Sequence, residues 1–158
     1  MRIKANLLLF SLGFILFGCS EPPYFEEYKS FEAQVWAEDE PVEFEVMVED
    51  TTAFYDLNLH LRHAHDYPYR NMYTFITLVF PNQKTMRDTL NIWMSDPAGR
   101  WYGEGISSVK NLGVRYKEKV QFPLKGKYIF EVKQGMRDEY LKGLENLGLE
   151  IRKSEIPE

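Results

Sequence analysis

Apolar and polar residues alternate along much of the chain after Phe31. Residues 42–49 place three valines and Phe44 on one side and mostly glutamate on the other, and residues 55–62 repeat the pattern. A period of two is that of a β-strand with one buried face and one solvated face. Between the two segments, residues 50–52 supply turn chemistry. The pattern therefore predicts two half-buried strands joined by a short turn.

The segments that follow are also short and bounded by turns. Residues 72–80 are apolar on both faces and predict a more central strand, and residues 89–94 alternate before the turn signal at 96–99. Further strands are predicted within 113–123 and at 128–132. Several short strands at this spacing predict an all-β, antiparallel β-sandwich of about seven to nine strands, either Ig-like or jelly-roll-like.

The period changes near the end of the chain. Apolar residues between 136 and 144 recur at helical spacing and predict one short C-terminal helix. Alternation returns in residues 147–153, which predict a last strand, and residues 154–158 form a tail.

The N-terminus has the layout of a secretory signal. Arg2 and Lys4 precede an apolar run over residues 7–17, and Cys19, the single cysteine, follows. This run is shorter than the roughly 20 residues that a spanning helix needs. A lone cysteine also has no partner for an internal disulfide.

The four residues Leu16-Phe17-Gly18-Cys19 resemble a bacterial lipobox, with Leu three positions before the cysteine and a small residue directly before it. The resemblance implies acylation of Cys19 and removal of residues 1–18. Phe17 departs from the small or β-branched residue usual at its position. The alternatives are an uncleaved N-terminal anchor helix and a chance cysteine. Two or three acyl chains on one residue would make a durable anchor, whereas a single chain holds only marginally.

These segments divide the chain into a signal peptide, an anchor, a domain and a tail. The predicted limits are 1–18 for the lipoprotein signal peptide, 19–29 for the acylated cysteine and its tether, 30–153 for the β-sandwich domain and 154–158 for the tail. The chain has 158 residues, so 140 remain after cleavage, which suits one domain. Loss of two positive charges with the signal takes the net charge from −5 to −7. This balance disfavours nucleic acid and gives no attraction to anionic lipids, so the lipid alone would hold the protein at a membrane.

Three histidines, His60, His63 and His65, invite a metal interpretation. In an extended segment His63 and His65 share one face and His60 lies on the other. At most two imidazoles therefore converge, whereas a catalytic zinc usually takes three protein ligands. His63 and His65 are the only candidates for a metal-dependent hydrolase, and ordinary histidines at a strand end are the alternative. No metal or other cofactor is predicted.

Signals for catalysis are missing from the sequence. There is no Gly-x-Ser-x-Gly elbow, and the glycines of residues 99–105 alternate with aromatics instead of forming a phosphate loop. In the lipid interpretation Cys19 is consumed by acylation. The sequence therefore predicts no catalytic residue and no enzyme.

Aromatic residues cluster after the histidines and suit a binding surface for a protein or a sugar. The alternative is that these rings cap the core, and both interpretations stay open. A sugar platform would also draw on Trp93. The candidate interaction surface consists of Tyr67, Tyr69, Arg70, Tyr73 and Trp101.

The order and spacing of residues along the mature chain resemble the GldH family of gliding-motility lipoproteins. The closing segment, with its Met136-Arg137 pair, is the most specific part. The matching residues are Trp36, Asp50, Leu61-Arg62, Tyr69 to Tyr73, Asp96-x-x-Gly-x-Trp-x-Gly-x-Gly105, Gly126-x-Tyr-x-Phe130, Gln134-x-Met-Arg137 and Leu141-x-Gly-Leu-x-x-Leu-Gly-Leu-x-Ile151.

This resemblance implies a non-enzymatic lipoprotein, anchored in a membrane of the cell envelope and needed for surface gliding and the associated secretion of adhesins. The implied partners are the membrane, through the N-terminal acyl groups, and proteins of the gliding and secretion apparatus, but no nucleic acid. No catalytic residue carries over from the family. The alternative function is that of a carbohydrate-binding surface lipoprotein in a polysaccharide-uptake system.

Overall fold

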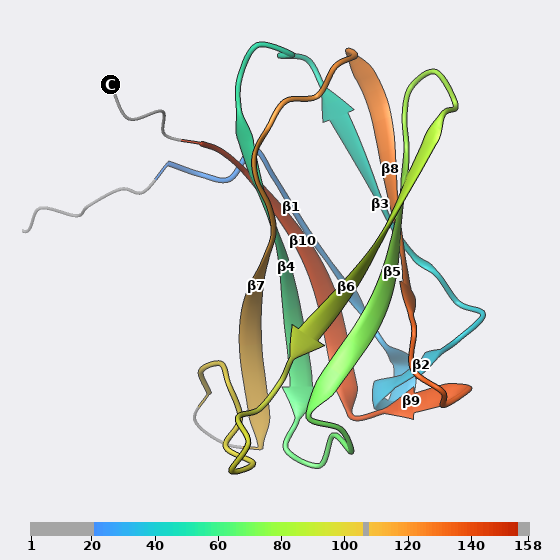
Figure 1. Ribbon diagram of the computed structural model, residues 1–158, viewed down its shortest axis with the longest axis vertical. Coiled ribbons are helices and arrows are strands. Elements are labelled where there is room, and N and C mark those ends of the chain that lie inside the picture. The colour runs from blue at the N-terminus through green and yellow to red at the C-terminus, as the bar shows by residue number, and fades with distance from the viewer. Residues whose placement is uncertain (1–20, 106–107, 155–158) are drawn as a thin grey trace, which may run out of the picture.

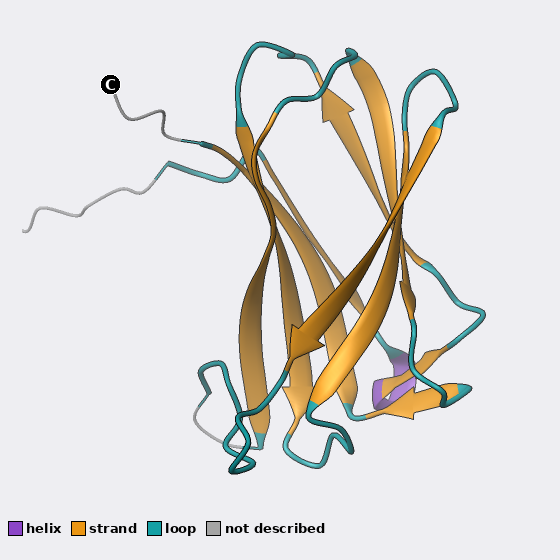
Figure 2. Ribbon diagram, viewed as in Figure 1, coloured by secondary structure: helices purple, strands orange, loops and turns teal. Residues whose placement is uncertain are grey.

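Two four-stranded antiparallel sheets pack face to face in the computed structural model, which describes residues 21–105 and 108–154 (Figures 1 and 2). This confirms the predicted all-β sandwich, with ten strands among the described residues instead of about seven to nine. The strands are β1 (Phe25–Ser30), β2 (Val35–Ala37), β3 (Val42–Val48), β4 (Tyr55–Ala64), β5 (Asn71–Val79), β6 (Thr85–Trp93), β7 (Val109–Val120), β8 (Gly126–Gln134), β9 (Tyr140–Lys142) and β10 (Leu144–Lys153).

The strand order is that of a jelly roll and not of an Ig domain. One sheet has the order β1-β10-β4-β7 and the other β3-β8-β5-β6, so successive long strands cross between sheets except at the β5–β6 hairpin. Eight long strands that cross in this way form two nested Greek keys. The short strands β2 and β9 pair with each other as a separate ribbon at one end of the sandwich (Figure 1).

Alternation along the strands builds the core between the sheets. In β3 every second residue is buried, from Val42 at 7% exposed to Phe44 at 0%, and the intervening glutamates face water. The same holds for Tyr55 to Leu61 in β4. Apolar side chains from both inner faces interdigitate, which is the packing expected of aligned sheets.

The predicted helix over residues 136–144 is wrong, because a turn and the short strand β9 occupy this segment. The buried Gln134 side chain takes over the hydrogen bonds that a helix would make: its Oε1 accepts from Met136 N at 2.8 Å and its Nε2 donates to Asp138 O at 2.6 Å. Leu141 then pairs with Trp36 of β2. Leu141 and Leu144 are buried by such long-range strand pairing and not by a helix face, whereas Tyr140 is 58% exposed.

The first strand begins inside the segment that the sequence assigns to the tether. Residues 25–30 form β1, which pairs with β10 in the sheet, so the described part of the tether is 21–24. The Arg152 side chain donates a hydrogen bond to the Glu21 carbonyl at 3.1 Å, which places the first described residues beside the end of β10, opposite the β2–β9 ribbon (Figure 1). The predicted signal peptide and lipobox lie outside the described residues. No helix within residues 21–105 and 108–154 is long and apolar enough to cross a bilayer.

Candidate functional site

The loop between β4 and β5 separates residues that the sequence groups into one interaction surface. Tyr67 is only 3% exposed, because the chain turns back after β4 with Tyr67 N donating to Ala64 O, and its hydroxyl donates to Asn71 O at 3.2 Å. Burial raises the pKa of Tyr67. Tyr67 is therefore a core residue at this end of the sandwich and offers no surface to a partner.

Trp101 also packs inward, against the histidines. Its ring centroid lies 4.8 Å from that of His63 and 6.4 Å from that of Tyr67. His63 is fully buried, and its Nδ1 donates to the Ala64 carbonyl at 2.9 Å. Burial lowers the pKa of His63, so the ring is held neutral. Among residues 21–105 and 108–154, His63 Nε2 and the Ser95 hydroxyl find no hydrogen-bond partner, and Ser95 forms a backbone bridge with Trp101.

The histidines do not converge as the metal interpretation requires. His63 points into the core, and His65 follows the end of β4 and is exposed. His60 lies on the outer face of the sheet, with Nε2 3.3 Å from a Glu150 carboxylate oxygen. Within residues 21–105 and 108–154, no group of three or more His, Cys, Asp or Glu side chains is placed to hold a metal ion.

Tyr69 and Arg70 lie at the surface near the turn that replaces the predicted helix. The Tyr69 hydroxyl donates to the Asp138 carboxylate at 2.8 Å, and this hydrogen bond raises the pKa of the tyrosine. The Arg70 side chain is exposed, and its carbonyl accepts hydrogen bonds from Met94 N and Ser95 N. These two residues therefore position loops around the sandwich end.

Exposed aromatic side chains gather on the outer face of the β3-β8-β5-β6 sheet. Tyr73 is 44% exposed, Phe75 is 43% exposed and Trp93 is 56% exposed. Tyr73 and Phe75 are successive outward residues of β5, and Tyr73 pairs with Asn91, two residues before Trp93 on β6. The three side chains thus lie on one sheet face as neighbours, and they are called the aromatic row below.

Only Tyr73 of the aromatic row was in the predicted interaction surface. Trp93 was a candidate for a sugar platform, and Phe75 was missed. The signal in the sequence was that residues 72–80 are apolar on both faces. A strand with one solvated side normally carries polar residues on that side, and here it carries Tyr73 and Phe75. That signal predicted a central strand, and it also marked an apolar outer surface.

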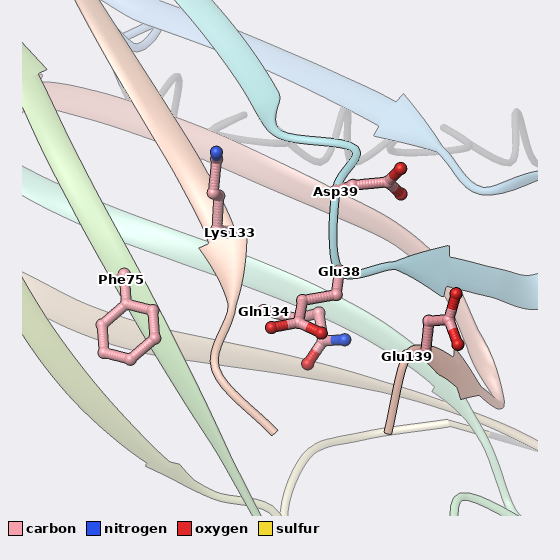
Figure 3. Close-up of a pocket in the computed structure, with 6 residues that line it drawn as sticks. All are labelled: Glu38, Asp39, Phe75, Lys133, Gln134 and Glu139. Atoms are coloured by element: carbon pink, nitrogen blue, oxygen red, sulfur yellow. The ribbon is translucent and has the colours of Figure 1, made fainter. Parts of the chain in front are cut away.

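A pocket of about 430 Å³ adjoins the aromatic row at Phe75 (Figure 3). Its acidic residues come from two loops: Glu38 and Asp39 follow β2, and Glu139 precedes β9. Gln134, which is 1% exposed, lies at its base. This carboxylate pocket is lined by Glu38, Asp39, Phe75, Lys133, Gln134 and Glu139.

The three carboxylates of this pocket form no ion pair with any residue that the structure describes. Within the described residues, Glu38, Asp39 and Glu139 make no ion pair, and Lys133 Nζ is 3.7 Å from Glu131. The charge of Glu139, its hydrogen bond to Tyr140 and the charges of neighbouring acids raise the pKa of Tyr140. Three carboxylates and one ammonium give the pocket a net charge of −2. Its chemistry is that of binding a cation beside an aromatic ring.

The family comparison covers nearly the whole described chain. A family model described as GldH lipoprotein matches residues 23–151. A Flavobacterium johnsoniae protein named Gliding motility lipoprotein GldH is 34% identical over 98% of this chain and 100% of its own length. A Christiangramia forsetii protein named Gliding motility lipoprotein GldH homolog is 34% identical over 98% of this chain and 99% of its own length. No solved structure matches the chain.

Proposed function

This chain belongs to the GldH lipoprotein family, and from that premise we propose that it is a lipid-anchored, non-enzymatic component or accessory factor of the gliding motility machinery and of the associated secretion of adhesins. The observation that carries the proposal is the 34% identity over 98% of the chain to a protein named for gliding motility. A relationship of this extent includes the N-terminal segment as well as the sandwich.

The proposed anchor is Cys19, acylated after cleavage behind Leu16, Phe17 and Gly18. The tether to the sandwich would then be residues 19–24, which reach at most about 20 Å when extended. Its described part lies beside the end of β10, because Arg152 donates a hydrogen bond to the Glu21 carbonyl (Figure 1). This end would face the membrane. The opposite end, with the β2–β9 ribbon and the carboxylate pocket, would face away from it.

The proposed mechanism is binding at a membrane surface. Acyl chains confine the domain to a thin layer, where its effective concentration near other envelope proteins is far higher than in solution. The net charge of −7 after cleavage repels anionic headgroups, so the acyl chains and not the protein surface would hold it there. No chemical step is needed for such a role.

The deciding experiment replaces the anchor residue in a gliding host. We expect Cys19→Ser to abolish palmitate incorporation, shift the protein from the membrane to the soluble fraction and stop colony spreading. The matched control is Ser20→Ala, which changes the next residue and leaves the thiol. Wild-type labelling and membrane retention in Cys19→Ser would contradict the proposed anchor, and normal spreading of a deletion strain would contradict the proposed role.

A second candidate function is sugar binding, favoured by one observation. Trp93 and Tyr73 expose 56% and 44% of their surface on the same sheet face, and amphipathic rings of this kind suit the faces of sugar rings. Trp101, which packs against His63, is not available for that purpose. Glycan-array binding that is lost in Trp93→Ala would establish this alternative.

A further inference from the structure

The aromatic row is an apolar surface that the described chain leaves uncovered. Tyr73, Phe75 and Trp93 are three of the eight large hydrophobic residues that are exposed in the described part of the chain, and they are neighbours on one face. Scattered exposed hydrophobics need no explanation, but a contiguous group marks an interaction site. Tyrosine and tryptophan are also the residues most enriched at the centres of protein interfaces.

The carboxylate pocket gives this surface a charge preference. Glu38, Asp39 and Glu139 line one pocket, and none of them makes an ion pair within the described residues, although Lys133, the register partner of Phe75, lines the same pocket. With three carboxylates and one ammonium in its lining, the pocket is net negative and attracts a cation more than an anion. The Phe75 ring in the pocket wall adds the negative face of an aromatic ring, which attracts lysine and arginine. A positively charged side chain is complementary to both features.

Three sets of contacts fix the backbone around the pocket. Glu38 N donates to the Glu139 carbonyl at 2.9 Å, which ties the two acidic loops together. Both polar atoms of the Gln134 side chain are hydrogen-bonded within the turn at its base. Gly135 fits beneath the Phe75 ring, where a Cβ would come within 2.9 Å of a ring carbon. Preorganised groups lose little entropy when a partner binds.

The position of the surface suits a partner away from the lipid. Strand β10 runs from Leu144, near the β2–β9 ribbon, to Lys153, near the tether, and ten residues of strand span roughly 30 Å. The pocket is at the ribbon end, which the proposed anchor directs away from the membrane. A protein standing beside the sandwich could therefore reach the pocket without entering the bilayer.

We propose that the aromatic row and the carboxylate pocket together form the docking surface for an envelope protein, which inserts a lysine or arginine side chain into the pocket and covers the aromatic row with apolar side chains. The proposal rests on the proposed function, because it names the kind of partner through which the anchored domain acts. A cationic partner is favoured over a sugar because the pocket is net negative, its three carboxylates make no ion pair within the part of the chain that is described, and Phe75 carries no polar group.

The test uses the full-length lipoprotein in a gliding host, with a photo-crosslinking residue in place of Tyr73. We compare the triple substitution Glu38→Lys, Asp39→Lys and Glu139→Lys with a matched control. The control reverses three exposed acids outside the pocket, each without an ion pair within the described residues, and so makes the same change in net charge. It consists of Glu32→Lys, Asp66→Lys and Glu104→Lys.

We expect one dominant adduct in the otherwise unchanged protein, reduced about tenfold or more by the pocket triple and kept by the control, because losing one side of a buried ion pair weakens an interface strongly. We also expect that replacing the partner's cross-linked lysine or arginine with glutamate restores the adduct to the pocket triple. Equal adducts in both triples, or no adduct, would overturn the proposal. A glycan ligand lost in Trp93→Ala would also overturn it.

Three further readouts separate this proposal from the anchoring role. Palmitate labelling and membrane fractionation should be unchanged in both triples, and limited proteolysis of the membranes should show the same resistant domain. Loss of spreading in the pocket triple alone is the expected result. If the pocket triple stays anchored and folded yet spreads normally, the docking surface is refuted and the proposed function stands. If a deletion strain spreads normally, the proposed function is refuted.

Discussion

The outer faces of the two sheets differ in how far the chain itself packs and pairs the side chains that lie on them. On the β1-β10-β4-β7 sheet, the Tyr28 ring covers Gly148, its register partner, so closely that a Cβ there would come within 2.4 Å of it. On the same face Glu150 is 7% exposed and contacts Asn58 and Arg152 at 3.0 and 2.7 Å. On the β3-β8-β5-β6 sheet, Lys127 pairs with Glu45 at 3.0 Å, but the aromatic row lies open beside three loop carboxylates that make no ion pair within the described residues.

This difference indicates that the first face contributes mainly to the stability of the domain and the second mainly to binding a partner. A face that pairs its own charges and covers its own glycines lowers the free energy of the isolated domain. A face that leaves aromatic rings exposed to water gains little stability from them until a partner covers them. Substitutions on the first face should therefore change the free energy of unfolding, and substitutions on the second should change activity in the cell.

The largest stability effect is expected at Glu150. The change Glu150→Ala removes the acceptor for Asn58, His60 and Arg152, and should lower the free energy of unfolding by about 2 kcal/mol. On the other sheet Glu43, which is exposed, provides the control, because Glu43→Ala should stay within about 0.5 kcal/mol. Urea unfolding of the purified proteins measures both. Equal decreases in the free energy of unfolding at the two positions would contradict the proposed difference between the faces.

A smaller loss is expected when the covered glycine is filled. The change Gly148→Ala should cost about 1 kcal/mol, because the new Cβ displaces the Tyr28 ring. In a Tyr28→Ala background the same change should be neutral or mildly stabilising, since alanine loses less backbone entropy than glycine. A double-mutant cycle by urea unfolding gives the coupling. Additive effects of the two changes would show that Tyr28 does not rest on Gly148.

The acid sensitivity of the first face is expected to be a modest effect. Burial raises the pKa of Glu150, but hydrogen bonds from Arg152, Asn58 and His60 outweigh it, so its folded-state pKa lies below the ordinary 4.5. The unfolded state thus binds the proton first. The stability from Glu150 is fully present above about pH 4.5 and is lost as pH falls through the lowered folded-state value.

Replacement of this carboxyl isolates its contribution to that acid sensitivity. Unfolding midpoints of Glu150→Gln should fall less steeply with acidification than those of the wild type. Several aspartates with lowered pKa values contribute the same slope to both proteins and cancel in the difference: Asp50, Asp56, Asp88 and Asp96. If the unfolding midpoints of both proteins fall equally steeply with pH, the Glu150 contacts do not contribute to the free energy of unfolding.

The strands of the sandwich could be predicted because their signal is local. The alternation in residues 42–48 and 55–61 reports burial on one side, and the turn between them is held by Asp50, which accepts hydrogen bonds from Thr52 and Ala53. The choice between Ig-like and jelly-roll-like could not be made, because it depends on which distant strands pair. The pairing of β1 with β10 joins residues more than a hundred positions apart.

The candidate site was harder to predict, since burial there depends on long-range contacts. Leu141 is buried by pairing with Trp36 and not by a helix, and Tyr67 is buried because the chain folds back after β4. The two-sided apolar pattern around Phe75 indicated burial on both faces, whereas the structure covers only the inner face. A pattern of residues shows that a surface is apolar, but not whether the same chain covers it.

The smallest effect on stability, and the largest on function, is expected from the aromatic row. The double change Tyr73→Ser and Trp93→Ser removes rings that are about half exposed and form no hydrogen bond through their side chains within the described residues, so the free energy of unfolding should change by no more than about 0.5 kcal/mol. Colony spreading should nevertheless be lost.

The control Met47→Ser removes another exposed apolar side chain from the tether end of the same sheet and should leave spreading intact. A stability loss above about 1.5 kcal/mol in the double variant would assign the row to the fold, because a surface kept for a partner contributes little to the domain alone.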